Sequence, residues 1–278
     1  MQGVIIKSIS GEYIVHTSEG NIVTKPLGIF RHRNVSPKVG DNVIVEDRMI
    51  TEILPRKNDL TRPNVANVDK IFILTSFTEP NLNLNLLDRL ISISEWEHLK
   101  IILVFTKKDL VNLKDFAREL EYYKKLSYPV YLMPGDEEGI KKEIENNICV
   151  VAGQSGVGKS TMINAIGKSL NIPTDEISKA LGRGKHTTRH VEIHAVAGGW
   201  IADTPGFGIS DLQMELVELS HTFIEFFNSN CRFSECLHIK EPGCEVKKKV
   251  ESKEILQSRY DNYLNFVEEI NNRKKPWE

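Results

Sequence analysis

The segment from Gly153 to Thr161 has the residue types and the spacing of a phosphate-binding loop. Its sequence, Gly-Gln-Ser-Gly-Val-Gly-Lys-Ser-Thr, fits the pattern G-x-x-x-x-G-K-[ST]. Glycine permits unusual backbone dihedrals and leaves room for several N–H groups around one anion. The helical spacing that begins near Lys159 would point the positive end of a helix dipole at that anion. A chance match is the alternative, and the apolar run Ile148–Ala152 before the loop disfavours it.

The polar side chains at the end of this loop predict a nucleotide bound together with a divalent cation. Lys159 is expected to reach the β- and γ-phosphates, and the hydroxyl of Ser160 is expected to ligate Mg²⁺. The whole loop is therefore assigned to nucleotide binding: Gly153, Gln154, Ser155, Gly156, Val157, Gly158, Lys159, Ser160 and Thr161.

A second motif, Thr106-Lys107-Lys108-Asp109, directly follows the apolar run Ile101–Phe105. It resembles the [NT]-K-x-D motif with which GTPases recognise guanine. The Asp109 carboxylate can accept hydrogens from guanine N1 and N2, which adenine does not offer, and the stem of Lys107 can lie over the base. Alone, such a motif is more often a surface loop, but beside a phosphate loop it predicts a guanine nucleotide. A phosphate-loop kinase, the competing enzyme class, has no use for this motif.

A third motif, Asp-Thr-Pro-Gly from Asp203 to Gly206, resembles the D-x-x-G motif of switch II in GTPases. Asp203 is expected to hold Mg²⁺ through water, and the Gly206 N–H is expected to bind the γ-phosphate. The segment 182–190, Gly-Arg-Gly-Lys-His-Thr-Thr-Arg-His, is the candidate for switch I, with Thr187 or Thr188 as the second hydroxyl on Mg²⁺. Its cations have two open interpretations, a solvated surface or a contact with RNA or phosphate.

The order of these motifs departs from that of ordinary GTPases. Those run from phosphate loop to switch I, switch II and base recognition, whereas residues 106–109 here precede residues 153–160, and both switches follow. The same sheet can be kept in such a rearrangement, because the termini of a compact domain lie at its surface. The sequence therefore predicts a circularly permuted core in which the chain leaves the sheet directly after switch II.

Strands and helices alternate from about residue 69 to 213. Continuous apolar runs at 71–75, 101–105 and 130–132 are typical of buried parallel strands, and helical spacing of apolar residues lies between them. This pattern predicts a parallel α/β sheet that is covered on both faces.

The amino-terminal 64 residues have a different pattern. Four short β-branched runs separated by glycine turns favour a small OB-fold barrel. Such barrels often bind RNA, and Phe30 beside the cations of residues 31–33 fits an RNA-binding surface. A core phenylalanine in a solvated loop is the simpler interpretation. Residues 56–68 are interpreted as a polar linker.

Three cysteines and a histidine cluster late in the chain, as Cys231-x₄-Cys236-x-His238-x₅-Cys244. Thiolate and imidazole ligands in this number suit a tetrahedral Zn²⁺ site. Because so short a segment buries little core, the metal would hold it folded. Three free cysteines clustered by chance are the alternative, and Cys149, which lies alone in a strand, is excluded from the site.

Helical spacing flanks this cluster at 215–227 and 253–272, and the apolar stripe of the second segment is expected to pack in a core. Between them, the cations of 247–249 either meet rRNA or face water.

The composition is that of an ordinary globular protein. The chain has 278 residues, 40% of them hydrophobic, and a formal net charge of -2. A nucleic-acid contact would therefore have to come from local basic patches. The chain contains no run of 18 apolar residues and no signal-peptide pattern at its start, so we expect no membrane span. The distribution of the four cysteines suits a reducing cytoplasm.

The permuted order, the segment 182–190, the Asp-Thr-Pro-Gly-Phe segment at 203–207 and the cysteine cluster together resemble the circularly permuted small ribosomal subunit biogenesis GTPases. The resemblance covers essentially the whole chain. It implies an α/β permuted GTPase core (65–213), preceded by an OB-fold β-barrel (1–64) and followed by an α-helical zinc-binding domain (214–278).

The resemblance also implies an activity and a partner. GTP would be hydrolysed to GDP and phosphate during late maturation of the small (30S) ribosomal subunit, in contact with its rRNA and with stimulation by the ribosome. We expect a monomer that uses Mg²⁺ and one structural Zn²⁺. The alternative is an RNA-binding assembly factor in which GTP is only a binding switch. The residues expected to carry hydrolysis are Lys159, Ser160, Thr188, Asp203 and Gly206.

Two features depart from the pattern of that family. Met133-Pro134-Gly135 stands where a Ser-Ser or Ser-Ala motif often supports the base, which leaves the back of the guanine pocket open. Phe207 stands where many GTPases place a water-orienting glutamine, so hydrolysis would use another group, supplied or positioned by the ribosome.

Overall fold

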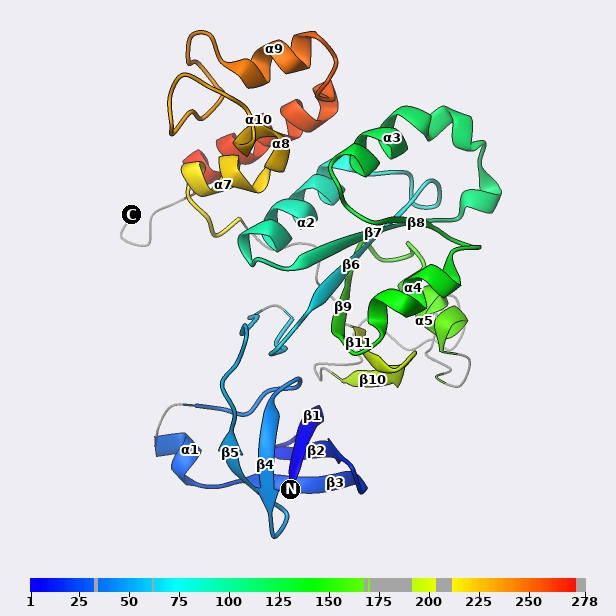
Figure 1. The fold of residues 1–278 in the computed structure, drawn as a ribbon, viewed down its shortest axis with the longest axis vertical. Helices are drawn as coiled ribbons and strands as arrows, with labels where there is room; N and C mark the ends of the chain where they lie inside the picture. The colour runs from blue at the N-terminus through cyan, green and yellow to red at the C-terminus, as the bar shows by residue number, and fades with distance from the viewer. Residues whose placement is uncertain (33–34, 62, 168–169, 171–191, 204–211, 274–278) are drawn as a thin grey trace.

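The structure is a computed structural model that describes the chain except for residues 33–34, 62, 168–169, 171–191, 204–211 and 274–278. A β-barrel, a mixed sheet with helices on its faces and a group of carboxy-terminal helices follow one another along the chain (Figure 1). The sheet and its helices lie between the other two parts. No helix within the described residues has the length and apolarity needed to cross a membrane.

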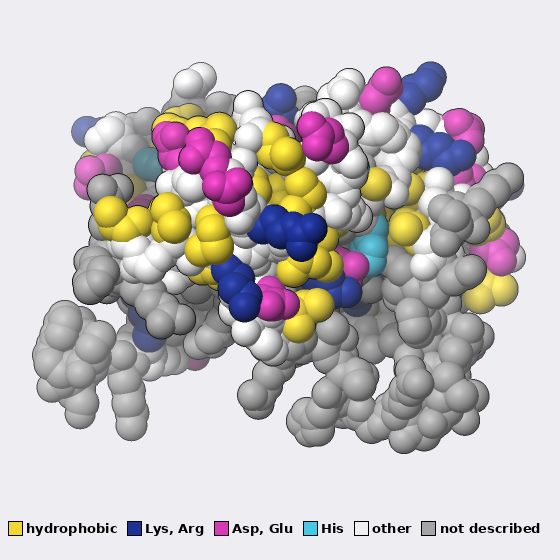
Figure 2. All heavy atoms as spheres, turned by 90° about the horizontal axis from the view of Figure 1, so that it is seen from below, with side chains coloured by type: hydrophobic (Ala, Val, Ile, Leu, Met, Phe, Trp, Pro, Cys, Tyr) yellow, Lys and Arg dark blue, Asp and Glu magenta, His cyan; other side chains and the backbone are white. Residues whose placement is uncertain are grey.

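The first part is a closed five-stranded barrel with the strand order β1-β2-β3-β5-β4. Alternate side chains of its strands point inward, and Ile5, Val15, Val43 and Ile50 are fully buried. The barrel confirms the predicted OB-fold class. Seen from the barrel end in Figure 2, hydrophobic side chains lie among charged ones. The strands are β1 (Gln2–Ile9), β2 (Glu12–Thr17), β3 (Gly20–Pro26), β4 (Asn42–Glu46) and β5 (Met49–Ile53), with the short helix α1 (Ile29–His32) after β3.

The second part is a six-stranded sheet with the order β10-β11-β9-β6-β7-β8. Every neighbouring pair in it is parallel except β10 and β11, which form an antiparallel hairpin. The predicted buried parallel sheet is confirmed, and its central strands are buried on both faces. The strands are β6 (Lys70–Ser76), β7 (Lys100–Thr106), β8 (Val130–Leu132), β9 (Ile148–Ala152), β10 (Ile193–Val196) and β11 (Gly199–Asp203).

Helices cover both faces of this sheet (Figure 1). On one face lie α2 (Leu84–Trp96) and α3 (Ala117–Lys125), which share a hydrophobic cluster with the barrel. On the other face lie α4 (Glu137–Ile144) and α5 (Lys159–Ile166). Two 3-10 helices, Lys108–Leu110 and Leu113–Phe116, precede α3.

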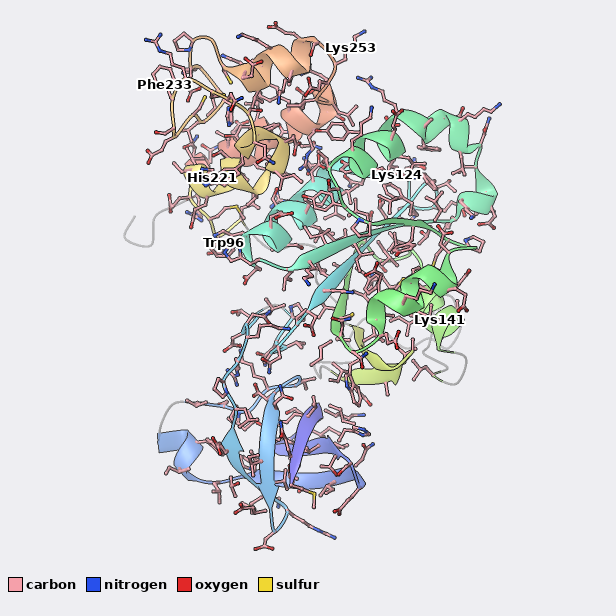
Figure 3. All side chains as sticks on the ribbon, viewed as in Figure 1. Trp96, Lys124, Lys141, His221, Phe233 and Lys253 are labelled. Carbon is pink, nitrogen blue, oxygen red and sulfur yellow. The ribbon has the colours of Figure 1, made fainter. Side chains whose placement is uncertain are left out.

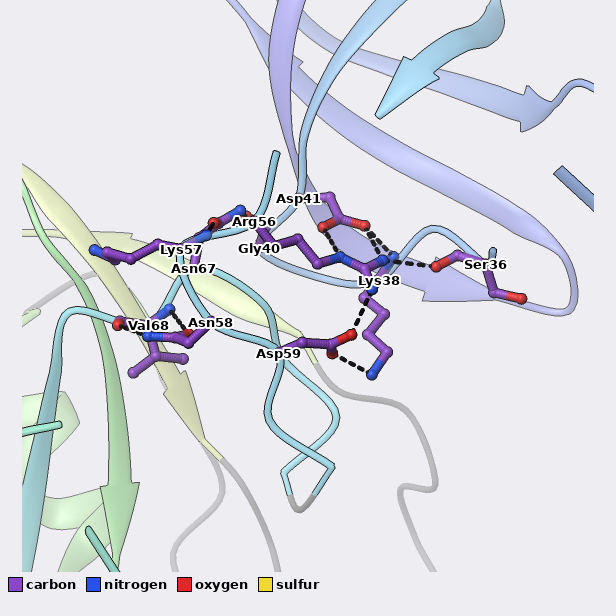
Figure 4. Close-up of polar contacts among 10 residues, drawn as sticks. All are labelled: Ser36, Lys38, Gly40, Asp41, Arg56, Lys57, Asn58, Asp59, Asn67 and Val68. Carbon is purple, nitrogen blue, oxygen red and sulfur yellow. Dashed lines mark hydrogen bonds and ion pairs between the residues drawn. The ribbon is translucent and has the colours of Figure 1, made fainter. Parts of the chain in front are cut away.

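The described residues of the segment 56–68 (56–61 and 63–68), interpreted from sequence as a polar linker, form an ordered strap with many hydrogen bonds (Figure 4). The Arg56 guanidinium binds both oxygens of Asp41 at 2.7 and 2.8 Å, and the Asp41 side chain is fully buried. Asn58 bonds the backbone N–H and C=O of Val68, and Asn67 bonds the carbonyl of Gly40. The strap therefore fixes the barrel to the sheet instead of letting it swing.

The third part is helical and packs against the second part, where it contacts α2. A single predicted helix at 215–227 is divided at Phe223, which is fully buried. The predicted helix at 253–272 begins later, and its apolar stripe faces a core as expected. The helices are α7 (Leu216–Thr222), α8 (Ile224–Phe227), α9 (Glu245–Glu251) and α10 (Gln257–Asn272).

A buried ionic cluster joins this third part to α2 and α3. Arg259 of α10 is fully buried, with Nη1 2.7 Å from Asp88 Oδ1 and Nε 2.8 Å from Glu225 Oε1. Tyr123 and Asn262 donate to the same Asp88 carboxylate at 2.6 and 2.7 Å. Burial by itself lowers the pKa of the Arg259 guanidinium, but the carboxylates of Glu225 and Asp88 raise it above its ordinary value, so the guanidinium stays charged.

Candidate GTP site and zinc site

The phosphate-loop residues lie at the carboxyl end of β9, between this strand and α5. Gly153 has φ +143°, and a Cβ atom there would lie 2.4 Å from the carbonyl oxygen of Leu74, so only glycine fits. Gly158, at φ +93°, is the residue before the first turn of α5. Lys159 Nζ donates to the carbonyls of Gly153 and Gln154 at 2.8 and 2.9 Å, which holds the ammonium over the loop. Ser160 and Thr161 follow in the first turn of α5.

The predicted guanine motif lies beside this loop. Thr106 is buried at the end of β7, and its hydroxyl donates to the carbonyl of Val157 at 2.6 Å. Lys107 has φ +60°, and its ammonium donates to the carbonyl of Glu79. Asp109 follows in a 3-10 helix with its side chain exposed. The fold therefore brings together two motifs that are far apart in the sequence.

The loop after β6 also belongs to this site, although it carries no motif that sequence reasoning could have used. Its Glu79 carbonyl holds Lys107, and its Pro80 Cδ would lie 3.6 Å from a Cβ atom on Gly156. The one available signal is positional, because polar loops at the carboxyl ends of neighbouring parallel strands meet at one edge of the sheet.

The unusual Met133-Pro134-Gly135 segment lies next to the guanine motif, as a base-supporting segment should. The backbone N–H of Lys108 donates to the Met133 carbonyl at 3.1 Å. A Cβ atom on Gly135 would lie 2.6 Å from Lys108 Nζ, so glycine lets this ammonium pack closely. The Gly135 N–H donates to the carboxylate of Glu137 at 2.9 Å.

The predicted switch residues fall mostly outside the described part of the chain. Thr187, Thr188, Gly206 and Phe207 lie there. The backbone of Asp203 ends β11 and pairs in register with Val151 of β9, which brings it to the same edge of the sheet as the phosphate loop.

The four predicted metal ligands converge between α8 and α9. Their ligand atoms, three Sγ and one imidazole nitrogen, all lie within 4.8 Å of one another. His238 Nδ1 is 3.6 Å from Cys231 Sγ and 3.4 Å from Cys244 Sγ, and Cys236 and Cys244 are buried. Three sulfurs and one nitrogen at this spacing are compatible with a tetrahedral Zn²⁺ site.

Neighbouring groups hold the ligand loop in shape. The Glu241 carboxylate accepts from the N–H groups of Leu237 and Ile239 at 2.9 and 2.8 Å. The Tyr260 hydroxyl donates to the carbonyl of His238 at 2.7 Å. Burial lowers the pKa of His238, so its ring is neutral and has a lone pair for a metal. Burial also raises the pKa of Cys236 to about 12, so a metal ion must displace a thiol proton there.

We expect the Cys236→Ser variant to lose most of its bound zinc and to unfold locally, because a hydroxyl replaces a thiolate ligand in the loop between α8 and α9, which apart from its cysteines contributes only Ile239 to the hydrophobic core. Cys149→Ser is the matched control, since Cys149 is buried in β9 and outside the cluster. Elemental analysis of both purified variants measures the difference. Equal zinc content in the two would contradict the assignment of these ligands.

A phosphate loop and a guanine motif that meet on one sheet in permuted order, with an OB-like barrel before and a Cys₃His cluster after, define the chain as a circularly permuted GTPase. Comparison with known proteins gives the family. The RsgA GTPase family matches residues 53–213, and the RsgA N-terminal domain matches residues 2–52. The chain belongs to the RsgA family of GTPases, which hydrolyse GTP.

Individual relatives agree over the full length. The chain is 44% identical to the small ribosomal subunit biogenesis GTPase RsgA of Enterococcus faecalis, covering 99% of this chain and 97% of that protein. It is 42% identical to the RsgA of Bacillus cereus, with 98% of each chain covered.

Solved structures show the same architecture. The crystal structure of YjeQ from Thermotoga maritima superposes with a TM-score of 0.84 at 34% identity, covering 98% of this chain and 99% of the other. The crystal structure of YloQ, described as a circularly permuted GTPase, superposes with a TM-score of 0.82 at 36% identity, covering 99% of this chain and 96% of the other. Membership of this family implies GTP, GDP and Mg²⁺ as ligands.

Proposed function

We propose that this chain binds the small (30S) ribosomal subunit late in its maturation and hydrolyses GTP faster when bound there. The observation that carries the GTPase part is the Thr106–Val157 hydrogen bond of 2.6 Å, which couples the guanine motif directly to the phosphate loop. The names of the full-length relatives support the ribosomal part, since they are small ribosomal subunit biogenesis GTPases.

The residues of the site take separate roles in this proposal. Lys159 leaves its two carbonyl partners and binds the β- and γ-phosphates, while glycine N–H groups of the loop surround them. Mg²⁺, when bound, neutralises charge that develops on the phosphates. Ser160 with Thr187 or Thr188 would supply its hydroxyl ligands, and Asp203 would hold it through water. The remaining assigned contacts are Thr106, Lys107, Lys108 and Asp109 to the base, Gly206 to the γ-phosphate, and Gln154, Ser155, Val157 and Thr161 along the loop.

The flanking parts would face the ribosome. We assign residues 1–64 to an OB-fold RNA-binding domain, 65–213 to the GTPase domain and 214–278 to a domain that Cys231, Cys236, His238 and Cys244 fold around one Zn²⁺. Phe233 and His221 lie on the helical part (Figure 3), and Phe233 is 44% exposed, a side chain that rRNA could cover. We expect a monomer in the cytoplasm, where subunits mature.

An RNA-binding assembly factor with GTP as a binding switch remains the second candidate. The residue that favours it is Phe207, which stands where a water-orienting glutamine would be and has no group that can hold water. In that case the chain would bind the subunit in a nucleotide-dependent way but turn over slowly even when bound.

Nucleotide-dependent binding to the small subunit tests the ribosomal part. Lys7 of β1 forms an ion pair with Glu192, which follows the predicted switch I segment in the sequence. The barrel therefore contacts the chain close to Thr187 and Thr188. We expect tighter co-sedimentation with small subunits in the presence of a non-hydrolysable GTP analogue than with GDP. Gly206→Ala should bind the analogue yet lose this difference, since an added methyl group crowds the γ-phosphate turn. Absence of binding in either nucleotide state would contradict the proposal.

A further inference from the structure

A cleft of about 570 Å³ lies between the barrel and the sheet. Val4 and Asn42 line it from the barrel, and Asn146 and Trp200 line it from the sheet. The lining residues of β9 and β11 are at the amino-terminal ends of these strands, whereas the phosphate loop follows the carboxyl end of β9. The cleft is therefore at the opposite edge of the sheet from the nucleotide site, and its size suits a nucleotide-sized ligand.

The two walls of the cleft present amide groups that the protein does not use. Within the described residues, the side chains of Asn42 and Asn146 have no hydrogen-bond partner, whereas the neighbouring Asn67 bonds both Gly40 and Lys57. A carboxamide offers a donor and an acceptor side by side, which is the pattern needed to bind the edge of a nucleobase.

An aromatic ring and two cations complete the lining. Trp200 is partly exposed, and the His16 ring meets it edge-on with 5.0 Å between centroids, which holds the indole in place. Arg56 and Lys57 also line the cleft, but both are paired, Arg56 with Asp41 and Asp59 and Lys57 with Asp69. The lining therefore offers a base an aromatic face and amide groups, while its charges are balanced within the protein.

The walls are held in fixed relation by the ordered strap. The bidentate Arg56–Asp41 pair, the Asn58–Val68 pair and the Asn67–Gly40 bond connect the barrel side to the start of β6 (Figure 4). A ligand that bridges Asn42 and Asn146 would therefore meet a site that needs little rearrangement, which favours affinity.

We propose that this cleft binds one unpaired nucleotide of an RNA strand, with the base stacked on Trp200 and its edge bonded by Asn42 and Asn146. The inference rests on the proposed function only for the source of the strand, which is the rRNA of the small subunit. Proteins commonly bind single-stranded RNA through bases that are splayed out, stacked on aromatic rings and hydrogen-bonded at their edges.

The test uses a short random-sequence oligoribonucleotide that carries 4-thiouridine. Fluorescence anisotropy measures its affinity for the full chain, and photo-cross-linking followed by mass spectrometry locates it. We expect cross-links on the peptide that contains Trp200. Trp200→Leu should weaken binding by about ten-fold or more, because stacking on an aromatic ring is lost, while Trp200→Phe should keep most of it.

Asn146→Asp supplies a second variant that preserves the fold. Asn146 has φ +57°, a conformation that aspartate tolerates, and the change replaces an amide donor by an anion facing RNA. Asn271→Asp, the same change at an exposed position on α10, is the control and should bind as the unmodified chain does.

Each outcome decides a different point. Equal affinities for Asn146→Asp and Asn271→Asp, or cross-links that map only to other surfaces, would overturn the cleft assignment and leave the proposed function standing. Cleft variants that lose small-subunit binding but keep oligonucleotide binding would indicate a ribosomal protein as occupant and also overturn it. An unmodified chain that binds the oligonucleotide but no small subunit would contradict the proposed function instead.

Discussion

Lys159→Ala is expected to reduce GTP turnover by at least about a hundredfold, the usual cost of removing a donor that stabilises charge in a transition state. The physical reason is the position of the ammonium, which now lies 2.8 and 2.9 Å from two carbonyls of the phosphate loop. In the complex it is the loop cation that can reach the transferring phosphate. Phosphate release from purified protein at saturating GTP measures the loss.

Lys142→Ala is the matched control for this change. Lys142 is exposed on α4, a helix that covers the same face of the sheet as α5, and its replacement by alanine removes the same charge as Lys159→Ala. Its turnover should equal that of the unmodified chain. A Lys159→Ala protein that keeps normal turnover would show that the phosphates bind elsewhere.

Arg259→Met is expected to destabilise the protein by about 3–5 kcal/mol, because it leaves the buried carboxylate of Asp88 without its counter-ion. Methionine fills much of the same space, so the loss comes mainly from the uncompensated charge. The free energy of unfolding from denaturant titration measures it. A Lys248→Ala control, which breaks an exposed pair with Glu245, should cost less than about 1 kcal/mol.

A double variant separates charge from packing at this cluster. Arg259→Met combined with Asp88→Asn removes both partners of the 2.7 Å ion pair, so it should recover part of the stability lost by Arg259→Met alone. If the stability lost by the double variant instead equals the sum of the losses of the two single variants, the destabilisation comes from packing and the ionic explanation is wrong.

The nucleotide site was predictable because its parts are short and contiguous. The phosphate loop needs glycines and a lysine at fixed spacing, and the guanine motif directly follows a buried strand, so both can be recognised locally. Their meeting through Thr106 and Val157 follows from a parallel sheet, whose carboxyl ends lie together. The loop of Glu79 and Pro80 carries no such pattern, and only the three-dimensional structure shows its contacts.

Elements that depend on tertiary packing were less predictable. The turn before β5 uses Asp47 and Arg48 at φ +48° and +58°, without the glycine that marks a turn in the sequence, and the strand was missed. The predicted helix over 215–227 divides at Phe223, whose ring packs in the core against Tyr263, with 5.1 Å between the ring centroids. No local sequence pattern predicts that bend.

Long-range polar pairs were not predictable at all. Charged side chains usually lie at the surface, so nothing in the sequence marks Arg56, in the predicted polar linker, or Arg259, in the predicted helix over 253–272, as a residue with buried partners. Their partners Asp41 and Asp88 are 15 and 171 residues away, and pairing over such separations leaves no periodicity to detect.

The central claim, that this RsgA-family GTPase acts on the small ribosomal subunit, is tested most directly by GTP turnover with and without that subunit. Partners that complete a GTPase site raise turnover by orders of magnitude, so we expect an increase of roughly ten-fold or more with small subunits. Large subunits at the same concentration should have no such effect. A rate that is the same with small subunits, with large subunits and with neither would contradict the claim.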